Sequence, residues 1–247
     1  MIHIAIFYHS SYSIFYSPSL LSTQFTFYNG ALMQLQDYRR EYIQSGLRRK
    51  DLNANPIEQF ETWMQQAIAS GLSDPTAMTL ATVAENGQPN QRIVLLKQVD
   101  EQGFVFFTNK QSIKGRAIAS NPKVSLHFPW YPLERQVRVQ GTAALLDEQE
   151  VANYFASRPK ESQLAAWASE QSQVIPSRDH LLEKFTELKQ QYAESDAPLP
   201  TFWGGYRVKP ICIEFWQGGE HRLHDRFIYS RETENSTHGW SIQRLAP

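Results

Sequence analysis

Cationic side chains occur in this chain at spacings that would let them contact an anion together. The segment 221–226 places Arg222, His224 and Arg226 at alternate positions, and alternate residues of a strand point to the same face. Three cationic or titratable groups on one face repel one another unless an anion or an aromatic ring lies against them. The alternative is a solvated strand face. The preceding segment 215–219 (FWQGG) is aromatic and ends in a tight turn, which favours a binding site.

A second cluster combines a phenol, a guanidinium and a hydroxyl. Tyr154 and Arg158 are four residues apart, on one face of an expected helix, and Ser162 follows just beyond Pro159. A guanidinium matches the geometry of a phosphate through two parallel hydrogen bonds. The three groups are therefore candidates for binding one phosphate, although packing on a helix surface would explain the pair taken alone.

Two weaker clusters complete the set. The expected strand 92–97 (RIVLLK) has a cation at each end, Arg92 and Lys97, and the segment 108–114 (TNKQSIK) lies at a strand-to-helix junction. The free N–H groups at a helix N-terminus favour an anion. Four such clusters in a chain of net charge −1 point to one large dianionic ligand or to two phosphorylated ligands.

The elements that must position these residues are mostly strands. Asn55-Pro56 is expected to separate a helical segment that starts at Met33 from a second helix ending at Ser70, and Asn86-Gly87 is a strong hairpin signal. Expected strands are 77–83, 91–96, 104–108, 123–128, 135–145, 203–208, 211–216, 221–229 and 240–245, and further helices are 110–120, 147–157 and one after Ser177. This pattern predicts an α+β, mainly β fold, a closed or partly closed antiparallel barrel with peripheral helices.

Composition narrows the class of protein. Residues 1–36 contain no charged side chain, no positive segment that would indicate a secretory signal, and no apolar run near 18 residues. We therefore expect no membrane span, an N-terminal extension 1–32 that is disordered or spurious, and one domain over 33–247. Cys212 stands in an apolar run and is expected to be buried; it has no disulfide partner, and metal-ligand spacing is missing, so the expected location is cytoplasmic. The near-neutral charge argues against nucleic-acid binding.

With these clusters in place, the chain resembles the pyridoxine/pyridoxamine 5'-phosphate oxidase family from about Arg39 to Pro247. The matching segments, in order, are RIVLLK (92–97), FTN (107–109), FPW (128–130), LERQV (133–137), YFASRP (154–159), FWGG (202–205), EFWQGG (214–219), RLHDR (222–226) and RLAP (244–247).

The resemblance implies an antiparallel split β-barrel that binds FMN at a homodimer interface. The implied activity is oxidation of pyridoxine 5'-phosphate or pyridoxamine 5'-phosphate at C4' to pyridoxal 5'-phosphate, with O2 reduced to H2O2. The implied FMN residues are Arg92, Val94, Leu95, Lys97, Phe107, Thr108, Lys114, Gln136, Gln171, Ser172, Trp216 and Arg226. The implied substrate residues are Arg39, Tyr42, Lys97, Tyr154, Arg158, Ser162, Arg222 and His224, of which Arg222 and His224 are the candidate catalytic pair. The segment 39–42 would close over the site.

One departure and three alternatives accompany this resemblance. The family usually has Ser-Arg-Lys where this chain has Ser112-Ile113-Lys114, so one arginine for the FMN phosphate is missing. Arg116 is a candidate to compensate for it, although it lies on a different helical face. The alternatives are a non-catalytic flavin- or haem-binding split barrel, a nucleic-acid-binding barrel, and a different FMN oxidoreductase on the same fold. The Tyr154/Arg158/Ser162 cluster and the RLHDR segment argue against the first.

Overall fold

A computed structural model describes residues 41–43, 46–231 and 239–247 of the chain. The expected extension 1–32, and Arg39, lie outside the described residues. The prediction of a helix between Met33 and Asn55 is wrong for the described part of this segment. Residues 41–43 and 46–48 are not helical, and Arg49–Asp51 forms only a 3-10 turn.

The second expected helix is confirmed. Helix α1 (Pro56–Ala69) begins at Asn55, whose side chain accepts a hydrogen bond from the backbone N–H of Ile57 at 2.9 Å. Proline at the first helical position suits this start, because its missing N–H would have no partner there. The helix packs Phe60 against Phe104 and Phe128, with ring centroids 4.9 Å apart in both pairs. These three rings are fully buried and lie in the main hydrophobic core.

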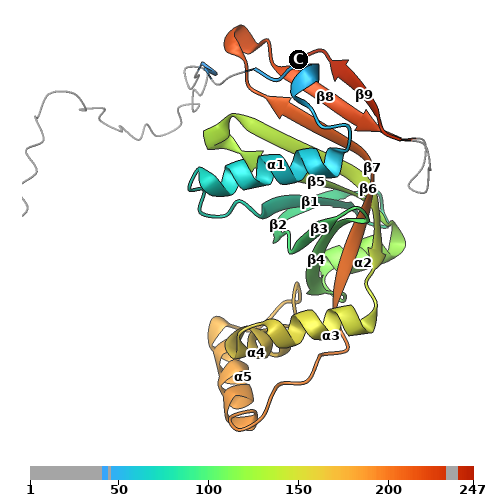
Figure 1. Ribbon diagram of the computed structural model, residues 1–247. Helices are drawn as coiled ribbons and strands as arrows, with labels where there is room; N and C mark the ends of the chain where they lie inside the picture. Colours follow the sequence, from blue (N-terminus) through green and yellow to red (C-terminus); the bar gives the residue numbers. More distant parts are fainter. Residues whose placement is uncertain (1–40, 44–45, 232–238) are drawn as a thin grey trace, which may run out of the picture. The chain divides into compact units, whose positions relative to one another are not determined.

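The described residues form one antiparallel sheet of nine strands. The strands are β1 (Ala77–Val83), β2 (Pro89–Leu95), β3 (Gln98–Asp100), β4 (Gly103–Asn109), β5 (Lys123–Trp130), β6 (Arg135–Leu145), β7 (Trp203–Gln217), β8 (Asp225–Ser230) and β9 (Ser241–Leu245). Their order is β2-β1-β5-β6-β7-β4-β3, and β8 pairs with both β7 and β9. Together with the peripheral helices, this curled antiparallel sheet confirms the predicted fold class, a mainly β split barrel (Figure 1).

The split in the barrel arises within β7. This strand pairs with β6 along its length, but its first half pairs on the other side with β4 and its second half with β8. The change of partner falls around Pro210, which has no N–H to donate to a ladder, and next to a shift in the β6–β7 register between Gln140 and Gly141, where Ile211 is the extra residue in β7. The two strands expected at 203–208 and 211–216 are therefore one, because β6 holds them in a single ladder.

Four further helices lie in the described residues: α2 (Ile113–Ser120), α3 (Glu148–Ser157), α4 (Lys160–Ala168) and α5 (Arg178–Gln191). Helices α2, α3 and α5 match the expected segments, each capped by a side chain at Ser112, Asp147 and Ser177. Helix α4 was not expected. Figure 1 shows α1 lying against the curled sheet, and α3, α4 and α5 gathered near the first residues of β7. There Val151 and Phe155 of α3 pack with Trp203 in a second, smaller core.

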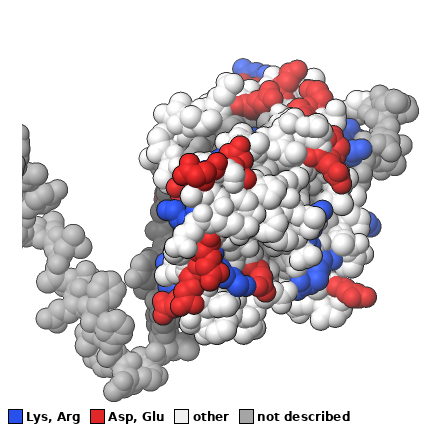
Figure 2. Space-filling view, turned by 90° about the horizontal axis from the view of Figure 1, so that it is seen from below, with Lys and Arg blue, Asp and Glu red and all other residues white. Residues whose placement is uncertain are grey.

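The surface carries charges of both signs. On the face drawn in Figure 2, acidic and basic side chains occur in separate small groups with uncharged residues between them. In the part of the chain that the structure describes, no helix is long and apolar enough to cross a membrane.

Candidate functional site

A cavity of about 800 Å³ opens between β2, β4, the start of β7, α2 and the α3–α4 turn. It is lined by Arg92, Ile93, Val94, Leu95, Lys97, Phe107, Thr108, Asn109, Lys114, Tyr154, Arg158, Pro159, Ser162, Ala165, Ala166, Ser169, Gln171 and Trp203. Four of these lining residues are Lys or Arg, and none of the described lining residues is Asp or Glu. Three of the four expected cationic clusters therefore meet around one space, and that space favours an anion.

Lys114 lies at one end of this cavity, in the first turn of α2. Its side chain is buried, and its ammonium nitrogen donates hydrogen bonds to Thr108 Oγ1 (3.1 Å), Ser112 Oγ (3.2 Å) and Gln171 Oε1 (2.6 Å). All three acceptors are neutral. Burial, and to a lesser degree the nearby charge of Arg92, lowers the pKa of Lys114 to about 8. An ammonium held by neutral oxygens in a buried position can be stabilised by an anionic ligand.

Arg92 projects from β2 toward the same end of the cavity. Its guanidinium donates hydrogen bonds to the backbone oxygen of Leu80 (3.0 Å), to Thr82 Oγ1 (2.9 Å) and to Asn90 Oδ1 (3.0 Å). These acceptors are also uncharged, and burial lowers the pKa of Arg92. The positive charge of this side chain is thus held in place without a carboxylate partner among its hydrogen bonds.

Tyr154 and Arg158 occupy the α3 side of the cavity. The Tyr154 ring stacks on Phe107 of β4, with centroids 3.8 Å apart and planes 9° apart. The Arg158 guanidinium lies over the Trp203 ring at 5.1 Å. Among the described residues, Nη1 of Arg158 is buried without a hydrogen-bond partner, and burial lowers the pKa of this group. A buried guanidinium nitrogen without an acceptor is costly unless a ligand supplies one.

Ser162 reaches the cavity because α4 begins directly after Pro159. The Ser162 N–H bonds the Pro159 oxygen at 2.8 Å, closing the first turn. Helix α4 also supplies three lining residues outside the predicted set, Ala165 and Ala166, with Ser169 at its end. The signal that would have revealed the helix is Pro159 itself, since proline is frequent where helices begin.

Other lining residues were also missed by sequence reasoning. They are Ile93, Asn109, Pro159 and Trp203. Trp203 belongs to a matching segment, FWGG, and the glycines of that segment indicate that other groups pack closely against the strand there. A Cβ on Gly205 would lie 2.8 Å from the Phe107 ring. Any larger residue at this position would therefore collide with the ring that stacks on Tyr154.

The remaining predicted residues gather elsewhere, in what we call the C-terminal cluster: Tyr42, Gln136, Trp216, Arg222, His224 and Arg226. The ring centroids of Trp216 and His224 are 4.5 Å apart, and Tyr42 packs edge-on against both, at 5.7 and 5.2 Å. None of the cluster residues lines the cavity of its own chain. Ser172 does not line it either, although its neighbour Gln171 does.

The prediction that Arg222, His224 and Arg226 share one face of a strand is wrong. Strand β8 starts only at Asp225, the partner of Gln217 in β7, so residues 218–224 form the connection of a hairpin. Within it Glu220–Arg222 makes a 3-10 turn, and His221 (φ 52°) and Arg222 (φ 64°) adopt left-handed backbone conformations. Such conformations cost energy for residues other than glycine and are concentrated at functional sites.

His224 and Arg226 are nonetheless well fixed. The Gly219 N–H donates to His224 Nδ1 at 3.2 Å, which leaves Nε2 as the protonated nitrogen of the neutral ring. Burial, and then the charge of Arg222, lowers the pKa of His224. Arg226 donates to Glu214 Oε1 at 2.8 Å and to the backbone oxygen of Ala246 at 2.6 Å.

The fold and the cavity define a split-barrel protein that accommodates an anionic ligand. A family model described as pyridoxamine 5'-phosphate oxidase matches residues 64–192, and one described as the pyridoxine 5'-phosphate oxidase C-terminal dimerisation region matches residues 203–247. Pyridoxine/pyridoxamine 5'-phosphate oxidases from Vibrio cholerae and Teredinibacter turnerae are 62% and 60% identical over 215 residues, 87% of this chain and all of each relative. The chain therefore belongs to the pyridoxine/pyridoxamine 5'-phosphate oxidase family.

Two solved structures have a similar fold. PhzG from Burkholderia lata, in complex with tetrahydrophenazine-1-carboxylic acid, is similar with a TM-score of 0.76 and 27% identity over 83% of this chain and 99% of that one. A pyridoxamine 5'-phosphate oxidase-related, FMN-binding protein from Nostoc punctiforme is similar in fold, with a TM-score of 0.61 and 18% identity over 79% of this chain and all of that one.

Proposed function

We propose that this protein oxidises pyridoxine 5'-phosphate and pyridoxamine 5'-phosphate to pyridoxal 5'-phosphate in the cytoplasm, as a homodimer that binds FMN. Pyridoxine 5'-phosphate and O2 give the aldehyde and H2O2; pyridoxamine 5'-phosphate also consumes water and releases ammonia. The observation that carries the proposal is the 800 Å³ cavity with four cations and no described carboxylate in its lining, in a chain 62% identical to an oxidase of this name.

The cations of the cavity suit two phosphate groups. Lys114 and Arg92, whose hydrogen-bond acceptors among the described residues are all neutral, are assigned to the phosphate of FMN. Tyr154, Arg158 and Ser162 are assigned to the phosphate of the substrate, with Lys97 close to both ligands. The unpartnered Nη1 of Arg158 supports this division, because a phosphate oxygen would complete its hydrogen bonding.

The C-terminal cluster belongs, in this proposal, to the cavity of the partner subunit. Its residues do not line the cavity of their own chain, and they fall in the region 203–247 matched by the dimerisation model, with the exception of Tyr42 and Gln136. In a dimer, each site would combine the cavity of one subunit with Trp216, Arg222 and His224 of the other.

In this proposal, the side chains of the protein hold and orient the substrate. Bound FMN supplies the two-electron acceptor chemistry, and O2 regenerates its oxidised form with release of H2O2. The phosphate contacts hold the substrate, and Arg222 lies over the pyridine ring and sets the position of C4'. His224 meets the C4' substituent through Nε2, the nitrogen left free by the hydrogen bond from Gly219. Placement of this kind lowers the barrier because the reacting atoms are already aligned.

The proposed reaction is tested by adding pyridoxine 5'-phosphate to FMN-loaded protein without oxygen. We expect loss of the visible flavin absorbance, its return on admission of air, and one H2O2 for each pyridoxal 5'-phosphate formed. A protein that binds FMN and keeps its colour after substrate is added would instead be a non-catalytic flavin-binding barrel.

The shared site is tested with hybrid dimers of Arg158→Ala and Arg222→Ala subunits, separated by different affinity tags. One of the two sites in the hybrid would contain an intact cavity and an intact C-terminal cluster, so its activity should approach half that of the wild type. Activity no higher than that of either variant homodimer would show that each chain forms its site alone.

A further inference from the structure

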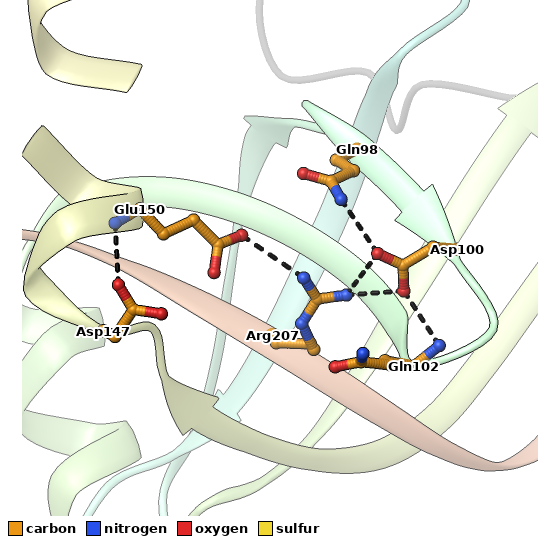
Figure 3. Close-up of polar contacts among 6 residues, drawn as sticks. All are labelled: Gln98, Asp100, Gln102, Asp147, Glu150 and Arg207. Atoms are coloured by element: carbon orange, nitrogen blue, oxygen red, sulfur yellow. Dashed lines mark hydrogen bonds and ion pairs between the residues drawn. The ribbon is translucent and has the colours of Figure 1, made fainter. Parts of the chain in front are cut away.

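Arg207 joins three parts of the chain that are distant in sequence. It lies on β7, its side chain is only 11% exposed, and its guanidinium donates hydrogen bonds to both carboxylate oxygens of Asp100 (2.5 and 2.7 Å) and to Glu150 Oε1 (3.3 Å). Figure 3 shows Arg207 between Asp100, at the β3–β4 turn, and Glu150, in the first turn of α3. A guanidinium is suited to this position because its donors form a rigid fork.

The Asp100 side of this arrangement is itself fixed. Gln98 Nε2 and the Gln102 N–H each donate to the Asp100 carboxylate at 2.8 Å (Figure 3). Burial would raise the pKa of Asp100, but the hydrogen bonds from Arg207 and the two glutamines outweigh it, and the pKa lies below its usual range. Asp100 therefore stays ionised and presents a fixed partner to Arg207.

On the other side, Glu150 lies in the first turn of α3, four residues before the cavity residue Tyr154. Glu150 and Tyr154 are four residues apart and so share one face of the helix, and Arg158 follows as the residue that caps its C-terminus. The backbone N–H of Glu150 donates to the capping carboxylate of Asp147 at 2.7 Å. The contact with Arg207 is therefore made in the capped first turn of the helix that carries Tyr154.

A second contact holds the next turn of α3 to the same strands. Tyr154 stacks on Phe107 at 3.8 Å. Phe107 pairs with Gly205 in the β4–β7 ladder, two residues from Arg207, and the ring lies over Gly205. Gly205 and Arg207 share a face of β7 because alternate residues do so. The Tyr154–Phe107 stack and the packing of Val151 and Phe155 with Trp203 hold α3 against β4 and the start of β7, and the ion pair from Glu150 to Arg207 adds a contact farther along β7.

We propose that Arg207, through Glu150, is a positioning residue for the substrate-phosphate end of the cavity. The contact fixes the position of α3 relative to the sheet, and this position in turn determines where Tyr154 and Arg158 lie. This inference rests on the proposed function. Arg207 is absent from the cavity lining, so it acts through α3 and touches neither substrate nor cofactor.

The first-turn carboxylates of α3 provide the test. Glu150 contacts Arg207, whereas Glu148 lies in the same turn and is exposed, so replacing either by alanine has a similar effect on the charge at the helix N-terminus. In the FMN-loaded enzyme, we expect Glu150→Ala to raise the KM for pyridoxine 5'-phosphate about three- to tenfold, with kcat and FMN affinity within about twofold of the wild type. Glu148→Ala should leave KM unchanged.

Two further measurements separate positioning from general stability. Arg207→Lys keeps the charge but loses the planar set of guanidinium donors, and it should raise KM as Glu150→Ala does. The KM of the double variant Arg207→Lys/Glu150→Ala should be little higher than that of either single variant. Arg231→Gln on the neighbouring chain segment, which removes hydrogen bonds to the Pro210 oxygen, should lower the melting temperature without changing KM. Equal KM values for Glu150→Ala and Glu148→Ala, or a KM that follows melting temperature across all the variants, would overturn the proposal.

Binding of inorganic phosphate, measured by calorimetry on the same proteins, keeps this test separate from the proposed function. If the wild type binds phosphate but does not oxidise pyridoxine 5'-phosphate, the function is wrong, while weaker phosphate binding by Glu150→Ala alone would still support the positioning role. Unchanged phosphate binding in an active enzyme would contradict the positioning role only.

Discussion

Lys114 donates a hydrogen bond of 2.6 Å to Gln171, and this contact joins the first turn of α2 to the segment that follows α4. The two residues are 57 positions apart in the sequence, and both line the cavity. Among the described residues, none of the hydrogen-bond partners of this ammonium is a carboxylate. A phosphate at this position would therefore supply the only full negative charge among its partners.

This environment predicts that FMN affinity depends on pH. Burial, and then the charge of Arg92, lowers the pKa of Lys114 to about 8, and a bound phosphate dianion would raise it. Affinity should be greatest below pH 8, where Lys114 is already charged, and should fall as pH rises above 8, by up to about tenfold per unit. Fluorescence titration with FMN from pH 7 to pH 9.5 measures this. In Lys114→Met the dependence should disappear and binding should be weaker throughout; an equally steep fall in that variant would assign the titration to another group.

Ile113 offers a gain-of-affinity experiment. It precedes Lys114 and its side chain is exposed, whereas the family usually has arginine there. We expect no compensation from Arg116, since it does not line the cavity and its guanidinium donates to the backbone oxygen of Gln111. Ile113→Arg should tighten FMN binding by about tenfold, the effect of one charge-assisted hydrogen bond.

The controls for this experiment are Ile113→Gln and Arg116→Ala, which should leave the dissociation constant for FMN within about twofold of the wild type. A tenfold loss in Arg116→Ala would show that this arginine does contact the phosphate.

The N-terminal extension gives a prediction that depends on sequence alone. Residues 1–32 carry no charged side chain and no persistent helical or strand periodicity. Removing them should leave the melting temperature and kcat/KM nearly unchanged. Calorimetry and steady-state kinetics of the shortened protein decide this, and a marked loss of either would mean that the segment packs on the domain.

Much of the fold could be predicted from the sequence because its signals are local. Strands β1 and β6 were predicted with the bounds that the structure has, since apolar alternation and flanking turn residues are both read within a few positions. Helix α1 was predicted from its proline and its apolar face. The family, confirmed by the relatives at 60–62% identity, was predicted from ordered motifs spread along the chain.

What could not be predicted depends on contacts between distant segments. Alternation in RLHDR looks like a strand, but the ladder between β7 and β8 ends at Gln217 and Asp225, so the preceding residues turn back instead. The continuity of β7 depends on β6, whose sequence lies more than 60 residues earlier. Likewise, nothing local indicates that Arg158 would line the cavity while Arg222 would not.

Because Arg158 lines the cavity of its own chain and Arg222 does not, the last prediction assigns the two arginines different roles in the reaction. Arg158, with its buried Nη1, is assigned to the substrate phosphate, a group that does not change during the reaction. Its contribution should be equal in the ground state and the transition state, so Arg158→Ala should raise KM more than it lowers kcat. A lost charge-assisted hydrogen bond of about 1.5–3 kcal/mol corresponds to roughly 10- to 150-fold.

Arg222→Ala should behave differently, because this residue is assigned to the reacting ring. Its backbone is left-handed (φ 64°), a costly conformation for a residue other than glycine, and a small displacement of C4' is felt in the chemical step. We expect a lower kcat, seen as slower anaerobic flavin reduction at saturating pyridoxine 5'-phosphate. Steady-state and single-turnover kinetics on both variants provide the comparison. If Arg158→Ala slows flavin reduction while Arg222→Ala changes only KM, the two roles are reversed; if neither variant differs from the wild type, the substrate binds elsewhere.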